Sequence, residues 1–261
     1  MQIVTLISDL GNKDWYAGAL KGALLKAAGG AAQLVDISHS IEPFEIVQAA
    51  LVSRNSWLEY PEGTIHLLAV NCVYDQEPRF IAVKRAGHYF LAPDNGLLSL
   101  ILGEIKPEDA RLLVNTDTSA HFAVKQVFSD AVGHLVSGQS MEALGEPAIA
   151  PAVEKIGLRP VINRDQIRGT VIHIDHFENV VLNIDQQMFA EASKGRSFSL
   201  YFKRNDPITT LSSNYGDVPV GETLCLFNSA GLLEIAVNFG KAATLLGLKK
   251  EDVVEVVFLS V

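Results

Sequence analysis

The order of strand-like and helix-like segments constrains the fold of this chain more than any other feature of its sequence. Up to about residue 147, apolar runs typical of buried strands alternate with stretches whose apolar residues recur at helical spacing. The strand-like runs are residues 2–8, 33–37, 64–70, 80–83 and 88–92, and the helix-like stretches are residues 15–28, 46–58 and 128–136. Such alternation predicts an α/β layered domain with a largely parallel sheet, because each helix returns the chain to the start of the next strand.

The second half of the chain has a different pattern. Prolines at positions 147, 151 and 160 interrupt a weakly periodic stretch that is typical of a linker. Beyond it, a single helix is expected near residues 241–248, among short strand-like runs at residues 170–174, 180–184, 197–202, 223–227 and 253–259. This density of strands favours a small β-barrel or sandwich. We therefore predict two domains, an α/β domain over residues 1–155 and a β-barrel-like domain over residues 156–261.

Composition limits the partners of the chain. Lys and Arg total 21 against 30 Asp and Glu, which argues against a surface for nucleic acid. The two cysteines lie in apolar runs and suggest buried thiols in a reducing compartment, and the seven histidines show no metal-ligand spacing. No leader sequence and no bilayer-spanning apolar run is evident. We expect a cytoplasmic protein without a bound metal, a cofactor or a membrane partner.

A carboxylate at the end of the first predicted strand is the first candidate for a binding site. Ligands of open α/β sheets bind beyond the carboxyl ends of the strands, where Ser8-Asp9-Leu10-Gly11 lies. The Asp9 carboxylate could accept hydrogen bonds from both hydroxyls of a ribose. Asp14 either caps the following helix or supplies a second acceptor.

Three further turns carry amide, hydroxyl or carboxylate groups. Pro93-Asp94-Asn95-Gly96 is either a turn with a helix cap or a means of placing Asn95 at the same sheet edge. Asp175-His176-Phe177-Glu178-Asn179 and Asn228-Ser229-Ala230-Gly231 are either plain hairpin turns or groups that read the edge of an adenine. The residues alone therefore predict a two-domain binder of a small molecule, namely a nucleoside.

Taken in order, these motifs resemble those of the S-adenosyl-L-methionine hydrolases (hydroxide adenosyltransferases), relatives of the S-adenosylmethionine-dependent fluorinase and chlorinase. The resemblance extends from residue 4 to about residue 245. The matching segments are Ser8-Asp9-Leu10-Gly11 with Asp14, Lys21-Gly22, Val35-Asp36-Ile37-Ser38-His39, Pro61-Glu62-Gly63-Thr64-Ile65-His66, Ala92-Pro93-Asp94-Asn95-Gly96, Asp175 with Asn179 and Asn183, and Asn228-Ser229-Ala230-Gly231-Leu232-Leu233-Glu234-Ile235-Ala236.

The resemblance implies a homotrimer whose ligand lies between the first domain of one subunit and the second domain of its neighbour. S-adenosylmethionine would be the substrate, and methionine would leave the ribose C5′ carbon as a neutral thioether that needs no acid. The enzyme must then supply alignment, desolvation and a nucleophile. The implied binding residues are Asp9 for the ribose, Asp14, Asp175 and Ser229 for the methionine portion, and Asn179 with the backbone near Val237 and Phe239 for the adenine.

The chain departs from the family at the residues that prepare the attacking water, which in the hydrolases are an Asp, an Arg and a His. Asn71 stands at the Asp position, and Pro78 at the first position of an Arg pair, so that Arg79 alone remains. Ala123 stands at the His position. An amide can orient a water molecule but cannot deprotonate it, and the loss of a general base costs about 10²–10⁴-fold in rate.

His121 or Asp75 could substitute for a missing member, although His121 could equally be an ordinary surface or core residue. We expect transfer of the adenosyl group to water, giving adenosine and methionine, with Asn71, Arg79 and His121 lining the nucleophile pocket. There are two alternatives. One is an enzyme that transfers the adenosyl group to a different nucleophile, such as a halide. The other is a non-catalytic binder or sensor of adenosine or S-adenosylmethionine.

Overall fold

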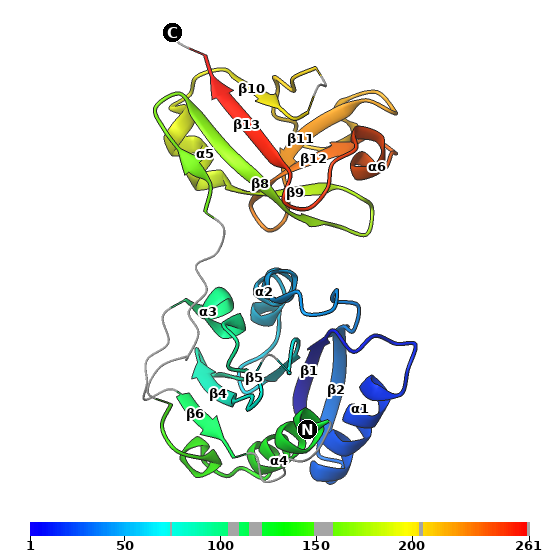
Figure 1. Ribbon diagram of the computed structural model, residues 1–261, viewed down its shortest axis with the longest axis vertical. Coiled ribbons are helices and arrows are strands. Elements are labelled where there is room, and N and C mark those ends of the chain that lie inside the picture. The colour runs from blue at the N-terminus through cyan, green and yellow to red at the C-terminus, as the bar shows by residue number, and fades with distance from the viewer. Residues whose placement is uncertain (74, 104–109, 115–121, 149–158, 204–205, 260–261) are drawn as a thin grey trace. The chain divides into compact units, whose positions relative to one another are not determined.

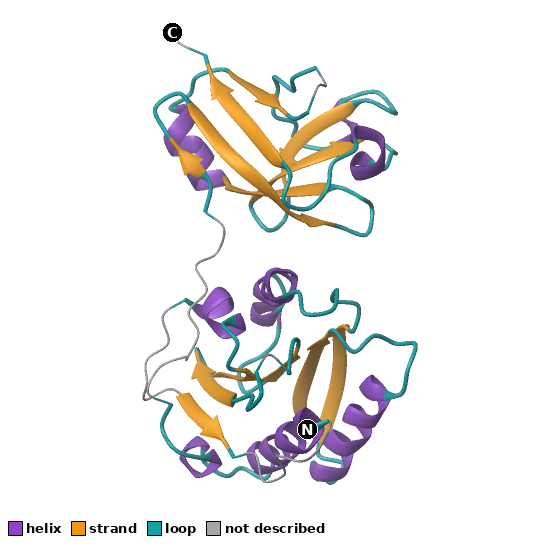
Figure 2. Ribbon diagram, viewed as in Figure 1, coloured by secondary structure: helices purple, strands orange, loops and turns teal. Residues whose placement is uncertain are grey.

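The chain forms two compact units, Met1–Ile156 and Gly157–Val261, in a computed structural model (Figure 1). Helices and strands mix in the first unit, whereas strands dominate the second (Figure 2). No helix in the part of the chain that the structure describes is long and apolar enough to cross a membrane. The described residues are 1–73, 75–103, 110–114, 122–148, 159–203 and 206–259.

A six-stranded sheet in the order β2-β1-β3-β5-β4-β6 forms the centre of the first unit. Its parallel strands are β1 (Gln2–Ser8), β2 (Ala32–Ser38), β3 (Ile65–Ala69) and β5 (His88–Pro93). Two antiparallel strands, β4 (Phe80–Arg85) and β6 (Ala110–Leu113), complete one edge. The predicted α/β fold with a largely parallel sheet is confirmed. Strand β6 was not predicted, because four residues are too few to show a period.

Helices cover both faces of this sheet. Helices α1 (Tyr16–Ala27) and α4 (Ala123–Val136) share one core with Val4 and Leu6, whereas α2 (Ile46–Arg54) and α3 (Leu97–Leu102) share another with Ile7. Successive β1 side chains point to opposite faces, so the strand supplies both cores. Helix α2 is shorter than predicted and is followed by a 3-10 turn, η1 (Trp57–Glu59), and α4 begins five residues earlier than predicted.

The second unit is a curled antiparallel sheet, as the predicted β-barrel-like domain requires. Its main strands follow the order β10-β13-β8-β9-β12-β11, and β7 (Val161–Ile162) pairs with β8. Register shifts in the pairings of β9 with β8 and β12 mark irregularities of the kind that bend a sheet. The main strands are β8 (Gln166–Ile174), β9 (Val180–Asp185), β10 (Phe198–Tyr201), β11 (Thr223–Phe227), β12 (Leu232–Val237) and β13 (Val253–Phe258).

The expectation of a single helix in this unit is wrong. Helix α6 (Ala242–Leu246) lies where it was expected, but α5 (Gln186–Ser193) also follows β9. Helix α5 buries only Phe189 and Ser193, so its apolar period is weak. The available signal was its N-cap, Asp185, whose carboxylate accepts the Met188 amide at 2.8 Å.

A buried pair of histidines lies near the amino-terminal ends of β3 and β5. The His66 ring contacts Thr5 Oγ1 at 2.8 Å through Nδ1 and His88 Nδ1 at 3.1 Å through Nε2. The Trp57 ring packs edge-on against His88. Burial and the neighbouring His88 lower the pKa of His66 to about 3, and burial also lowers the pKa of His88. Both rings are therefore neutral near pH 7.

We predict that this pair makes the first unit lose stability as the pH falls from about 6.5 toward 3. An unfolded histidine has a pKa of about 6.5, so over this window protons bind the unfolded chain and favour unfolding. For His66 the loss is about 1.4 kcal/mol per pH unit. Urea unfolding followed by tryptophan fluorescence measures it, because both tryptophans, Trp15 and Trp57, lie in the first unit.

The variant His66→Gln removes the titrating ring and should flatten this dependence between pH 7 and pH 5. His134→Gln, a half-buried histidine on α4, serves as the control and should keep the wild-type slope. Parallel profiles for the wild type and His66→Gln would show that the pair does not carry the acid sensitivity.

Candidate functional site

The Asp9 carboxylate joins the segments that follow three neighbouring strands. Its Oδ2 atom accepts the backbone N–H groups of Phe44 and Asn71, each at 3.0 Å. Phe44 lies beyond β2 and Asn71 beyond β3, the two neighbours of β1. From the described residues no hydrogen bond reaches Oδ1, and the side chain is only partly buried. Asp9 therefore has a fixed orientation and one oxygen with which to bind a ligand.

Asn71 turns the chain just beyond β3. Its φ of 50° lies in the left-handed region, which Asn adopts more readily than most residues. In this conformation its N–H reaches Asp9 and its carbonyl accepts the Asn95 side-chain Nδ2 at 3.1 Å. Asn71 is therefore suited to this position by its backbone conformation.

Asn95 lies at the expected edge of the sheet, but its amide is used within the protein. The side chain is buried, and its Nδ2 donates to the Val70 and Asn71 carbonyls while its Oδ1 accepts the Leu97 N–H at 3.1 Å. These bonds join the end of β3 to the start of α3. We infer that Asn95 positions the Asn71 turn, and its predicted contact with a ligand stays a prediction.

Arg79 is held at the same edge by Asp94. Arg79 Nη2 lies 3.2 Å from Asp94 Oδ2, and the Asp94 side chain is 1% exposed against 44% for Arg79. The Arg79 guanidinium thus contacts a buried carboxylate and is itself partly exposed to solvent. Sequence reasoning treated Asp94 only as a turn residue, although a carboxylate directly after a buried strand was a signal for such a partner.

Of the two residues that could replace a missing family member, Asp75 is exposed and accepts the Gln76 N–H at 2.6 Å. His121 lies outside the described residues.

Burial, together with the Asp9 charge, raises the pKa of the neighbouring Cys72 thiol well above its usual range. A protonated thiol is a poor nucleophile, so Cys72 is not suited to attack a bound ligand.

Asp14 lies in the exposed segment before α1. The N-cap position of α1 is occupied by Trp15, and no side chain caps the helix. The interpretation of Asp14 as a helix cap is therefore wrong, and its role as a ligand acceptor stays a prediction.

In the second unit, the turn between β8 and β9 is stabilised by Asp175. Its carboxylate accepts the Asn179 backbone N–H at 2.7 Å and the Asn179 side-chain Nδ2 at 3.1 Å. The hairpin turn predicted here is present. Beside it, Lys241 Nζ lies 2.8 Å from Glu178 Oε1 and the Ala243 N–H donates to the Glu178 carbonyl. These contacts place the start of α6 next to the turn.

The segment between β12 and α6 contains Val237 and Phe239. Val237 is buried in the core of the unit, whereas Phe239 is 92% exposed with a φ of 54°. The Val237 side chain is therefore not available for a ligand, and the Val237 carbonyl already accepts the Gly240 N–H at 2.9 Å. The contact of this backbone with an adenine stays a prediction.

A buried carboxylate, Glu234 on β12, supports the turn that carries Ser229. Its two oxygens accept Tyr215 OH at 2.8 Å and Asn228 Nδ2 at 3.0 Å. Asn228 Oδ1 in turn accepts the backbone N–H groups of Ala230 and Leu232, which leaves Ser229 exposed at the tip. Glu234 was predicted only as part of a matching segment and without a role, although a Glu within an apolar strand was a signal for a buried partner.

The ionisable groups around Glu234 affect one another's pKa values. Burial raises the pKa of Glu234, and the nearby Asp175 charge adds to the rise. Burial and the hydrogen bond to Glu234 raise the pKa of Tyr215 to about 12. Glu234 is thus a buried carboxyl group near Asp175 that supports the turn carrying the exposed Ser229, rather than a group offered to a ligand.

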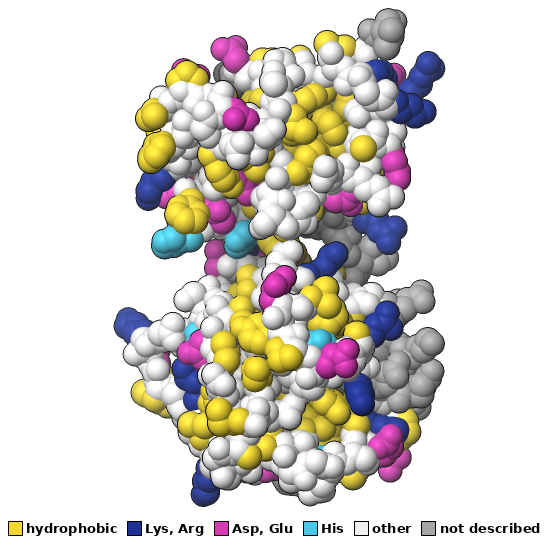
Figure 3. All heavy atoms as spheres, turned by 180° about the vertical axis from the view of Figure 1, so that it is seen from behind, with side chains coloured by type: hydrophobic (Ala, Val, Ile, Leu, Met, Phe, Trp, Pro, Cys, Tyr) yellow, Lys and Arg dark blue, Asp and Glu magenta, His cyan; other side chains and the backbone are white. Residues whose placement is uncertain are grey.

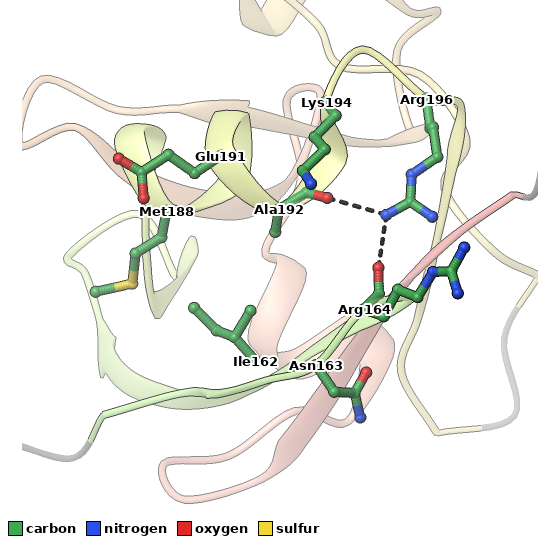
Figure 4. Close-up of a pocket in the computed structure, with 8 residues that line it drawn as sticks. All are labelled: Ile162, Asn163, Arg164, Met188, Glu191, Ala192, Lys194 and Arg196. Carbon is green, nitrogen blue, oxygen red and sulfur yellow. Dashed lines mark hydrogen bonds between the residues drawn. The ribbon is translucent and has the colours of Figure 1, made fainter.

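A cavity of about 430 Å³ lies elsewhere in the second unit, between α5 and the β7–β8 turn (Figure 4). Arg196 donates there to the Arg164 and Ala192 carbonyls at 2.7 and 3.0 Å, so its guanidinium is used by the protein. None of the residues predicted for the site lines this cavity.

Lys and Arg side chains are scattered over the face drawn in Figure 3 rather than gathered in one patch. Within the described residues, no three His, Cys, Asp or Glu side chains form a metal site.

The variant Asn95→Ala should lower the free energy of unfolding of the first unit by about 2–4 kcal/mol, because it leaves buried backbone groups without partners. Urea unfolding measures the change. The control is Asn55→Ala, because the exposed Asn55 side chain also donates to a carbonyl, that of Leu51, and its loss should cost less than about 0.5 kcal/mol. Equal effects of the two variants would contradict the positioning role of Asn95.

Comparison with known proteins gives matches over both units. Residues 4–145 match the family described as SAM hydroxide adenosyltransferase N-terminal domain, and residues 169–255 match its C-terminal domain. The chain is 29% identical to (R)-S-adenosyl-L-methionine hydrolase from Thermus thermophilus, over 96% of this chain and 97% of that protein. It is 24% identical to a fluorinase from Actinopolyspora mzabensis, over 95% of this chain and 94% of the fluorinase.

A similar fold occurs in the crystal structure of an uncharacterized conserved protein from Thermotoga maritima. The TM-score is 0.85 at 29% sequence identity, and the superposition covers 98% of this chain and 100% of the other.

Proposed function

The chain belongs to the SAM hydroxide adenosyltransferase family, and we propose that it transfers the adenosyl group of S-adenosylmethionine to water, giving adenosine and L-methionine. The protein is in this view a hydrolase that acts on a small-molecule substrate. The reaction needs no cofactor, because the sulfonium of the substrate is already an activated leaving group. Both cysteines are free thiols, which supports a cytoplasmic location.

The geometry of Asp9 is the observation that carries this proposal. Two backbone amides hold Oδ2, so the carboxylate cannot rotate, and Oδ1 is left for a ligand at the carboxyl end of the sheet. A fixed carboxylate is a strong acceptor for the adjacent hydroxyls of a ribose. The amide contacts also reduce the ordering that binding would otherwise require.

The second unit supplies groups that suit the other parts of the substrate. Asp175 and Ser229, with Asp14 of the first unit, would bind the methionine portion, whose ammonium favours carboxylate and hydroxyl oxygens. Asn179 and the backbone of 237–239 would bind the adenine. We propose that the complete site forms in a homotrimer, between the first unit of one subunit and the second unit of its neighbour.

In the proposed reaction a water oxygen forms a bond to C5′ while the C5′–S bond breaks. The electron pair of that bond goes to sulfur, which becomes a neutral thioether, and the water loses a proton to solvent. Asn71 and Arg79, with His121, would line the position of the water. Neither the Asn71 amide nor the Arg79 guanidinium is a general base, so without a base at His121 orientation and desolvation must supply most of the rate enhancement. Slow turnover is expected.

The purified protein should convert S-adenosylmethionine to adenosine and methionine faster than the spontaneous reaction, as chromatography of the products would show. Asp9→Asn should weaken adenosine binding about 100-fold, because a charged acceptor for two hydroxyls is lost. The control is Asp130→Asn, an exposed carboxylate on α4 that should keep wild-type affinity. Unchanged affinity in Asp9→Asn would place the nucleoside elsewhere.

The same assay separates the two alternatives. Tight binding of S-adenosylmethionine in calorimetry without any adenosine formed would identify a binder or sensor. Formation of a 5′-halo nucleoside after addition of chloride would identify a different nucleophile.

A mixing experiment tests the shared site. Asp9→Ala and Asp175→Ala should each be inactive, but together they should form trimers with one intact site in every mixed assembly. Random assembly of equal amounts then restores about one quarter of the wild-type activity, because three quarters of the trimers are mixed and each has one working site of three. If each site lay within a single subunit, mixing would restore nothing.

A further inference from the structure

Four polar side chains form a continuous series of hydrogen bonds beside the segment that carries Asp9. Lys21 Nζ lies 2.7 Å from Asp36 Oδ2, and Asp36 Oδ1 lies 3.1 Å from His39 Nε2. His39 Nδ1 lies 2.7 Å from Ser8 Oγ. Ser8 and His39 are buried, and Ser8 directly precedes Asp9. The proposed function uses none of these four residues.

The direction of each hydrogen bond follows from the charge of Asp36. Burial raises the pKa of this carboxyl, but the hydrogen bonds from Lys21 and His39 outweigh it and lower the pKa overall. An ionised carboxylate only accepts, so His39 Nε2 carries a proton, and in the neutral ring Nδ1 accepts from the Ser8 hydroxyl. Ser8 Oγ in turn accepts the Leu10 N–H at 3.3 Å. Each donor in this series of hydrogen bonds therefore has a defined acceptor.

Backbone contacts join the same two segments on both sides of Asp9. The Gly11 N–H donates to the His39 carbonyl at 2.9 Å, and the Ile41 N–H donates to the Ser8 carbonyl at 3.4 Å. The Phe44 N–H donates to Asp9 itself. His39 therefore contacts the segment around Asp9 both through its ring, which bonds to Ser8, and through its carbonyl, which accepts the Gly11 N–H. The orientation of Asp9 thus depends on how His39 is held.

This serine, histidine and aspartate do not form a nucleophilic triad, despite the order of their contacts. Ser8 is 0% exposed, so no substrate carbon could reach its oxygen. Its hydroxyl also donates to His39 and accepts from Leu10, which leaves it no role as a nucleophile. The arrangement orders the backbone instead.

We propose that Ser8 and His39 are positioning residues that hold the Asp9 carboxylate in register with the hydroxyls of a bound ribose. This inference rests on the proposed function of Asp9. It predicts an effect on ribose recognition alone, because the Ser8 and His39 side chains join the two backbone segments on either side of Asp9 rather than the groups proposed to bind adenine and methionine.

The test compares adenosine with 2′,3′-dideoxyadenosine, which lacks the two hydroxyls. Chemical-shift titration by NMR gives dissociation constants for both probes, up to the millimolar range. Ser8→Ala and His39→Asn should bind adenosine about tenfold more weakly than the wild type, because the buried partners of the lost groups leave Asp9 less well held. Their affinity for dideoxyadenosine should stay within about twofold of the wild type.

The control variant is His88→Asn, which removes a buried histidine near the opposite end of the parallel strands and should change neither affinity. Equal weakening toward both probes, or unchanged affinity for adenosine in Ser8→Ala and His39→Asn, would overturn the proposal. If His39→Asn does not fold, as judged by circular dichroism, Ser8→Ala decides the question because it removes a single oxygen. Equal binding of the two probes to the wild type would instead refute the ribose role of Asp9.

Discussion

A single carboxylate oxygen, Oδ2 of Asp9, accepts backbone N–H groups from beyond both neighbours of β1. Parallel strands bring their carboxyl ends to one edge, but the loops that leave that edge need not stay together. Here the Asp9 oxygen joins them. Because Asn71 and Phe44 both have positive φ, each presents its N–H in a conformation that most residues avoid. The local strain is tolerated because the hydrogen bonds to a charged acceptor are strong.

The same interaction links binding to reaction chemistry. By the resemblance, Asn71 stands where the family has a carboxylate, and its backbone is held by Asp9 on one side and Asn95 on the other. In the proposed function, the backbone that would line the position of the attacking water is thus held by the same carboxylate that would bind the ribose. A sulfonium leaves without acid catalysis, so a pocket that orients water retains the main requirement of the reaction.

Most of the framework was predictable because it depends on short-range pattern. Buried strands such as β3 are continuous apolar runs, and the predicted runs at residues 80–83 and 88–92 form the β4–β5 hairpin, in whose turn Ala86 and Gly87 have positive φ. Helix α5 was missed because a helix that buries only Phe189 and Ser193 shows little periodicity. Phe189 packs against the rings of Phe227 and Phe258, which are distant in the sequence, and no local window contains these contacts.

The sequence by itself determined the order of most elements, the family resemblance and the residue types at the strand ends. Only the tertiary structure decided which polar atoms remain available for a ligand. Asn95 and Asp9 both lie at the predicted edge, yet the Asn95 amide is used by Val70, Asn71 and Leu97, whereas Asp9 keeps one oxygen. The physical reason is that a side chain has a fixed number of donors and acceptors. Partners distant in the sequence occupy them, as the Ser8–His39 contact does across 31 residues.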